Sequence, residues 1–222
     1  MKTRSEQFAI YCDEHFDMKN KRTPNYHSLP ICIIDCVYSL RAKYKTITLP
    51  IVQRYADAFM NGDPNSSGDT ISQFIQNIDE IGGTEEFTEQ IIKNHQKLGG
   101  LNKIPKADVC YQLARYLNLL HIDTIEDFQS FESQELLEVV IHAVKGMGNA
   151  GTNYLFMLTG DSSRCKPDVH LHRCVEDACG CKLNDDEIQT LFEEAIQFLH
   201  KKYPDLTVRD LDSIIWEVYQ QR

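Results

Sequence analysis

Two glycines separated by one residue, at positions 146 and 148, lie between two apolar helical stretches. Residues 132–144 have the apolar spacing of an amphipathic helix, and the stretch that follows Asn149 repeats it. Because glycine adopts positive φ without steric cost, the KGMG tetrad at 145–148 predicts a tight reversal between two helices, with Asn149 as the cap of the second. Backbone N–H groups at such a turn and at a helix N-terminus suit a phosphate.

Helical periodicity and helix-starting residues recur along nearly the whole chain, and no stretch has the alternation of a strand. About eleven helices joined by short loops predict an all-α protein. One expected helix covers residues 84–99. The most apolar covers residues 28–40 and is expected to be the core helix; its Asp35 is interpreted as a satisfied buried polar residue, with a pocket-lining role as the alternative.

A second helix start follows the glycine turn, where Pro167 and Asp168 lie about twenty residues after the second glycine. A carboxylate at a helix N-terminus is stabilised by the helix dipole and by backbone N–H groups. His170 and Arg173 complete an Asp-x-His-x-x-Arg segment with this acid.

The two motifs together resemble the helix–hairpin–helix (HhH-GPD) DNA glycosylase superfamily, the fold of endonuclease III and alkyladenine glycosylase. Its hairpin pattern, hydrophobic-x-G-hydrophobic-G, corresponds here to VKGMG at 144–148, followed by NAGT. The family's acidic segment, V/P-D-x-H-x-x-R, corresponds to PDVHLHR at 167–173. The order of helices over about residues 30–175 is also similar, so the resemblance covers most of the chain.

The resemblance implies a two-lobed, all-α architecture with a cleft between the lobes. Residues 31–162 would form a central helical lobe that contains the hairpin, and residues 1–30 with 163–222 would form the second lobe. The cleft would hold a base extruded from the DNA.

The same resemblance assigns roles to individual residues. The residues expected to contact DNA are Lys145, Gly146, Met147, Gly148, Asn149, Gly151 and Thr152 in the hairpin, Lys43, Tyr44 and Lys45 in an early link, and Arg173. Tyr44 would stack in the gap left by a flipped base, with the two lysines on phosphates. The alternatives are a purely structural turn, a packing tyrosine with solvated lysines, and an Arg173 that pairs with a carboxylate.

Asp168 is the expected catalytic residue. Beside C1′ of a flipped nucleotide, its carboxylate would stabilise the positive charge that develops as the N-glycosidic bond breaks and would orient a water. The alternative is a plain helix cap, which contributes about 1 kcal/mol. The lysine of lyase-competent relatives is replaced by Ala150, and Lys145 lies before the first glycine. The resemblance therefore implies a monofunctional DNA glycosylase of base excision repair, a hydrolase acting on double-stranded DNA with a damaged base, for which an alkylated base is one candidate.

The alternative function is a non-catalytic DNA-structure-binding or protein-interaction module on the same fold. A net charge of −10 favours this alternative, whereas the acid at position 168 favours the enzyme. Residues 31–55 and 141–174 are nevertheless locally basic, either by chance or because they meet phosphates.

Metal and membrane signals are weak in this sequence. Six thiol and imidazole side chains lie within seventeen residues: Cys165, His170, His172, Cys174, Cys179 and Cys181. They contain no C-x₂-C pair and lack the iron–sulfur spacing of some endonuclease III relatives, so we expect no metal cofactor. A monovalent cation on the hairpin carbonyls is compatible with the resemblance.

No apolar run approaches the length of a membrane span. We expect an intracellular monomer, in the cytoplasm and nucleoid or in the nucleus, with reduced thiols.

Overall fold

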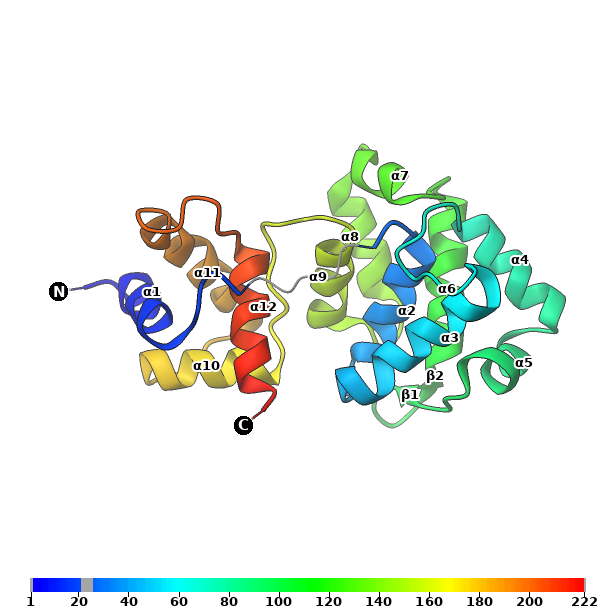
Figure 1. Cartoon of the computed structure of the whole chain (residues 1–222), viewed down its shortest axis with the longest axis horizontal. Coiled ribbons are helices and arrows are strands. Elements are labelled where there is room, and N and C mark those ends of the chain that lie inside the picture. Colours follow the sequence, from blue (N-terminus) through cyan, green and yellow to red (C-terminus); the bar gives the residue numbers. More distant parts are fainter. Residues whose placement is uncertain (1, 21–25, 222) are drawn as a thin grey trace. The chain divides into compact units, whose positions relative to one another are not determined.

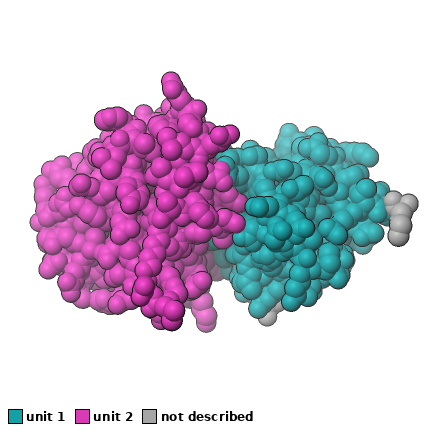
Figure 2. Space-filling model, turned by 180° about the vertical axis from the view of Figure 1, so that it is seen from behind, with its two compact units in different colours: residues 1–24, 160–222 teal, residues 25–159 magenta. Residues whose placement is uncertain are grey.

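The chain folds into two compact units, seen in a computed structural model that describes residues 2–20 and 26–221 (Figures 1 and 2). Unit 1 comprises residues 1–24 and 160–222, and unit 2 comprises residues 25–159. The resemblance to the glycosylases predicts a central lobe at residues 31–162. The expected all-α class is confirmed, since nearly all regular structure is helical.

The described residues form twelve α-helices, two π-helical turns and two short strands (Figure 1). Unit 1 contains α1 (Arg4–His15), α10 (Val169–Cys179), α11 (Asp185–Leu199) and α12 (Val208–Tyr219). Unit 2 contains α2 (Leu29–Ser39), η1 (Tyr44–Thr48), α3 (Leu49–Phe59), α4 (Ile71–Ile81), α5 (Thr84–Phe87), η2 (Thr88–Ile92), β1 (Lys97–Leu98), β2 (Ile104–Pro105), α6 (Lys106–Leu119), α7 (Ile125–Ser130), α8 (Gln134–Ala143) and α9 (Gly148–Leu158).

Unit 2 is built around α2, which packs against α3, α4, α6 and α9. Ser28 starts the helix by accepting a hydrogen bond from the N–H of Ile31, and a proline in the first turn needs no helical N–H partner. Residues 31–38 are all 0% exposed, so the helix is buried on every side. The predicted core helix is confirmed.

The buried ammonium group of Lys106 caps the C-terminus of α2. The Nζ of Lys106 donates hydrogen bonds to the carbonyls of Tyr38 (3.0 Å) and Leu40 (2.8 Å) and to Oε1 of Gln96 (3.1 Å). A cation at a helix C-terminus satisfies carbonyls that lack helical partners and interacts favourably with the dipole. Because Lys106 begins α6, this contact joins the ends of two helices to the segment before β1.

The expected helix over residues 84–99 is wrong in its second half. The helical chain ends at Ile92, and Lys93 adopts a left-handed φ of +52°. The following residues lack apolar helical periodicity, and β1 pairs antiparallel with β2, with Leu98 opposite Ile104. Leu98 is buried against the glycine turn, since a Cβ at Gly146 would lie 2.8 Å from the Cβ of Leu98.

Unit 1 is a small helical unit with its own core. Helix α1 packs on α10 and α11, and the rings of Phe8 and Phe192 lie 5.1 Å apart at its centre. The predicted start of α11 is confirmed, because Asn184 and Glu187 form a reciprocal capping box. A second capping box at Thr207 starts α12.

We predict that Gly146→Ala lowers the free energy of unfolding by roughly 2–4 kcal/mol, because a side chain there adds left-handed strain to a clash with Leu98. Gly100→Ala is the matched control, since no atom lies within 4 Å of a Cβ at that position. Urea unfolding of both variants gives the comparison. Equal stability of the two variants would show that the close packing of the glycine turn is not required.

Candidate functional site

The glycine turn has the reversal that its sequence predicts. Gly146 and Gly148 have φ of +100° and +54°. Helix α9 begins at Gly148, with Met147 at its cap position, so the expected capping role of Asn149 is wrong. Met147 is buried and anchors the turn, and the helix begins two residues earlier than expected.

The predicted contact residues of the hairpin divide into an exposed and a buried set. The exposed residues are Lys145, Gly146, Gly148 and Asn149. Thr152 is buried and donates its hydroxyl to the carbonyl of Gly148 at 2.8 Å. Gly151 is buried against α2: its carbonyl accepts from the thiol of Cys36, and its N–H is donated to the Met147 carbonyl. The buried set therefore holds α9 against the core, and the exposed set faces outward.

The early link is tied to the core through Tyr44. Lys43 and Lys45 are exposed, whereas the Tyr44 hydroxyl donates to Oδ2 of Asp35 at 2.6 Å. Insertion of this ring into DNA would first require that hydrogen bond to break. The structure thus gives Tyr44 an anchoring contact that the sequence did not indicate.

Asp35 accepts three tyrosine hydroxyls. Besides Tyr44, Tyr26 donates to Oδ2 at 2.8 Å and Tyr154 donates to Oδ1 at 2.9 Å. Burial, reinforced by the Asp35 charge, raises the pKa of all three phenols, so they remain neutral donors. The interpretation of Asp35 as a satisfied buried polar residue is confirmed, and the cluster joins η1 to α9.

Three segments of unit 2 are neighbours: the glycine turn, the β1–β2 hairpin and the early link. Leu98 packs on Gly146, and a Cβ at Gly99 would lie 3.5 Å from Cε of Lys145. The early link leaves α2 at Leu40, whose carbonyl binds Lys106 beside β2. Residues 36–56, 90–107 and 139–160, which contain these segments, include no aspartate or glutamate.

We call five exposed lysines, from the early link, the β1–β2 hairpin and the glycine turn, the basic cluster: Lys43, Lys45, Lys97, Lys103 and Lys145. Sequence reasoning missed Lys97 and Lys103, because the sequence predicts a helix and a loop where the structure has the β1–β2 hairpin. The acid-free run at 90–107 was the signal that could have identified them.

Asp168 lies at the cap position of α10 in unit 1. Its Oδ1 accepts hydrogen bonds from the N–H groups of His170 (2.8 Å) and Leu171 (3.3 Å). The side chain is half-buried, and within the described residues its Oδ2 accepts no hydrogen bond. Arg173, further along α10, is exposed. The carboxylate is thus fixed by one of its two oxygens.

A second acid, Asp212, lies next to this segment and was missed by sequence reasoning. Its Oδ2 accepts the N–H of Lys166 at 2.5 Å. Burial raises the pKa of the Asp212 carboxyl to about 8, and the charge of Asp168 adds to the increase. The signal was an acid on the apolar face of a helix, beside Leu211 and one turn from Ile215.

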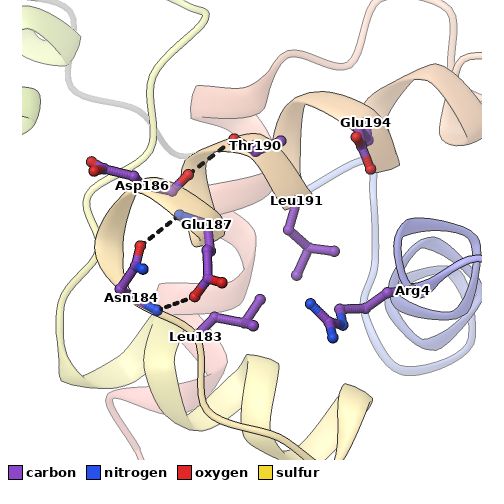
Figure 3. A pocket seen from close by; sticks show the side chains of 8 residues that line it. All are labelled: Arg4, Leu183, Asn184, Asp186, Glu187, Thr190, Leu191 and Glu194. Atoms are coloured by element: carbon purple, nitrogen blue, oxygen red, sulfur yellow. Dashed lines mark hydrogen bonds between the residues drawn. The ribbon is translucent and has the colours of Figure 1, made fainter.

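A pocket of about 380 Å³ in unit 1 lies elsewhere (Figure 3). The residues that line it are Arg4, Leu183, Asn184, Asp186, Glu187, Thr190, Leu191 and Glu194. Glu187 points back to the N–H of Asn184, as the dashed line in Figure 3 shows, so its carboxylate serves to start α11. The lining includes neither Asp168 nor Arg173, and its three acids are unsuited to a phosphate.

The thiols and acids of the described residues include no group of three or more His, Cys, Asp or Glu side chains that could hold a metal ion. Burial raises the pKa of the Cys12 and Cys165 thiols, which keeps them protonated. Within residues 2–20 and 26–221, no helix has the length and apolar character needed to cross a membrane.

We predict that Tyr44→Phe and Tyr154→Phe each lower the free energy of unfolding by about 1.5–3 kcal/mol, because each removes a hydrogen bond to the buried Asp35 carboxyl. Tyr111→Phe is the control, since this tyrosine makes a similar hydrogen bond to Asp79 at the surface. It should cost under about 0.5 kcal/mol. Thermal unfolding measures all three, and a Tyr44 variant as stable as the control would exclude the anchoring contact.

Comparison with known proteins gives one match. The family described as "Domain of unknown function (DUF8548)" matches residues 6–221, which is nearly the whole chain. No curated protein and no solved structure matches.

Proposed function

The chain belongs to the DUF8548 family, and we propose that it is a monofunctional DNA N-glycosylase of base excision repair. It would hydrolyse the bond between a damaged base and deoxyribose in double-stranded DNA, as an intracellular monomer with a two-lobed, glycosylase-like fold. One observation carries the proposal: the glycine turn, the β1–β2 hairpin and the early link are neighbours, and all three contain lysines and no acid.

Phosphate binding is the function we assign to the basic cluster. The protein as a whole repels DNA, because its net charge is −10. Local charge governs contact with phosphates, however, and exposed Lys145 lies directly before the N-terminus of α9, next to the β1–β2 hairpin that carries exposed Lys97 and Lys103. Lys97 and Lys103 extend the predicted contact surface from the helical hairpin to the β1–β2 hairpin.

Base release is the function we assign to Asp168. The N-glycosidic bond breaks and C1′ gains a hydroxyl from water. The remaining proton of the water goes to a neutral departing base, or to solvent when the departing base was cationic. One carboxylate oxygen is held by the start of α10, and Oδ2 would stabilise the positive charge at C1′ and orient the water. Ala150 excludes a Schiff base at the position of the lyase lysine, and an alkylated, cationic purine suits this mechanism because it leaves readily without an acid.

The alternative is a non-catalytic module that binds DNA structure or a protein partner. One observation favours it: Asp168 already has a structural role, because its Oδ1 caps α10 with two hydrogen bonds. Under this alternative the basic cluster binds DNA and no lesion is processed.

We predict that Asp168→Asn abolishes base release, by at least about 100-fold, while leaving the fold intact. Asparagine keeps the capping oxygen but lacks the charge. The assay uses duplexes with alkylated, deaminated or oxidised bases, followed by alkaline scission of abasic sites. Asp185→Asn, an exchange of a nearby helix-start acid that contacts His172, is the control and should release base normally.

Unchanged release by the Asp168 variant would refute its catalytic role. DNA binding by the wild-type protein without release from any lesion would instead favour the non-catalytic module.

We predict that replacing Lys97, Lys103 and Lys145 together by alanine weakens DNA binding and reduces the slope of log K against log salt by about 3, roughly one unit for each ammonium group removed from a phosphate. The matched control replaces the exposed lysines of unit 1, Lys19, Lys182 and Lys201. Fluorescence anisotropy over a salt series measures both. Equal slopes in the two triple variants would show that the basic cluster does not contact DNA.

A further inference from the structure

The segment that leads into α10 is held along its backbone by other parts of unit 1. The carbonyl of Ser162 accepts the N–H of Arg209 at 3.1 Å. Gln189 contacts two residues of this segment, as its Nε2 donates to the Ser163 carbonyl (2.8 Å) and its Oε1 accepts the N–H of Cys165 (2.9 Å). Besides the local contacts of Ser163 and Arg164 with Asp161, residues 162–165 are therefore held by backbone and amide groups from α11 and α12.

The last contact of this series is made by an acid. Asp212 accepts the N–H of Lys166, and the carbonyl of Lys166 accepts the N–H of Asp168 at 2.6 Å. Two consecutive hydrogen bonds thus connect the Asp212 carboxyl to the backbone of the proposed catalytic residue. Asp168 then caps α10 through its own side chain.

The carboxyl of Asp212 lies in an apolar environment. Asp212 is 5% exposed, and its neighbours Leu211 and Ile215 are 0% exposed. Burying a carboxyl group costs free energy unless it is well paired, and a neutral amide could accept the same N–H. What the geometry requires at position 212 is therefore a side-chain oxygen that accepts the Lys166 N–H behind Asp168.

We propose that Asp212 is a positioning residue for Asp168, which fixes the Lys166 backbone and so sets the position of the Asp168 carboxylate. This inference rests on the proposed function, since Asp168 is the group that it positions. Asp212 itself is buried and touches no substrate.

The charge state of Asp212 follows from the groups that face it. Burial and the Asp168 charge raise its pKa, while the Lys166 N–H and the charges of Lys166 and Arg209 oppose them, which leaves a pKa of about 8. The nearby Cys165 thiol stays neutral, because burial and the Asp212 charge raise its pKa. At neutral pH Asp212 is therefore mostly protonated.

The test compares two substitutions in single-turnover base release. Asp212→Asn keeps an acceptor for Lys166 and should retain kcat within about threefold, whereas Asp212→Leu removes it and should lower kcat by about 10- to 100-fold with KM unchanged. Ile215→Ala is the matched control, a destabilising core change in the same helix that leaves the Lys166 contact intact. It should lower stability without lowering kcat.

Equal kcat for the folded leucine and asparagine variants would overturn the proposal. So would a parallel loss in the Ile215 control, because general destabilisation would then explain the effect.

Amide hydrogen exchange tests the inference without any activity. The leucine variant should lose protection at the Lys166 and Asp168 N–H groups, and the asparagine variant should keep it. Unchanged protection in the leucine variant would overturn the proposal even in an active enzyme. If the wild-type protein releases no base but the protection changes as expected, the proposed function fails while the positioning contact stands.

The pH dependence of stability identifies the buried acid. Since the folded-state pKa is about 8 and an unfolded aspartate titrates near 4, the folded state binds the extra proton between these values. Wild-type stability relative to Asp212→Asn should therefore be highest below about pH 4, fall by up to tenfold in the folding constant per pH unit between about 4 and 8, and then level off. A constant difference across this range would overturn the assignment of a protonated Asp212.

Discussion

The arrangement of the segments that carry the basic cluster depends on the buried ammonium group of Lys106. A helix that is apolar on every side, such as α2, must end inside the protein, and its last carbonyls then have no water to bind. Lys106 supplies the missing donors at Tyr38 and Leu40 and also binds the Gln96 side chain. The chain is thereby free to leave the core as an exposed link, and the segment that carries β1 is held beside it.

The placement of charge in the molecule follows from this arrangement. Acidic residues outnumber basic ones over the whole chain, yet none lies in the three stretches that meet at the glycine turn. The contact between Leu98 and Gly146 brings the β1–β2 hairpin to the helical hairpin, and the Asp35 cluster ties the early link to α9. Unit 2 thus presents lysines, whereas unit 1 presents the acid proposed for chemistry.

Much of the fold could be predicted from local sequence signals. Ser28, Asn184 and the glycine turn mark boundaries through capping and positive φ, which depend on a few neighbouring residues. Strands of two residues have no periodicity to detect, so β1 and β2 could not be found in this way. Asparagine is a common helix-capping residue, which favours a cap at Asn149. The structure instead has the buried Met147 at the cap position, and the helix begins at Gly148.

The candidate site was less accessible to such reasoning. The sequence indicated Asp168 and the exposed turn, because both are local motifs. The lysine of position 106 gives no sign in the sequence that it is buried, and the three tyrosines on Asp35 come from segments as far apart as residues 26 and 154. Asp212 is forty-four positions from Asp168, and only the tertiary fold places it against the Lys166 backbone.

The most direct test of the account is amide hydrogen exchange of the wild-type protein with and without a duplex that carries an abasic-site analogue. Binding as described should increase protection in both units: in the early link, the β1–β2 hairpin and the glycine turn of unit 2, and around residue 168 at the start of α10 in unit 1. Protection in unit 2 alone would leave a DNA-binding module without the proposed chemistry. Unchanged exchange in all four segments at low salt would contradict the account as a whole.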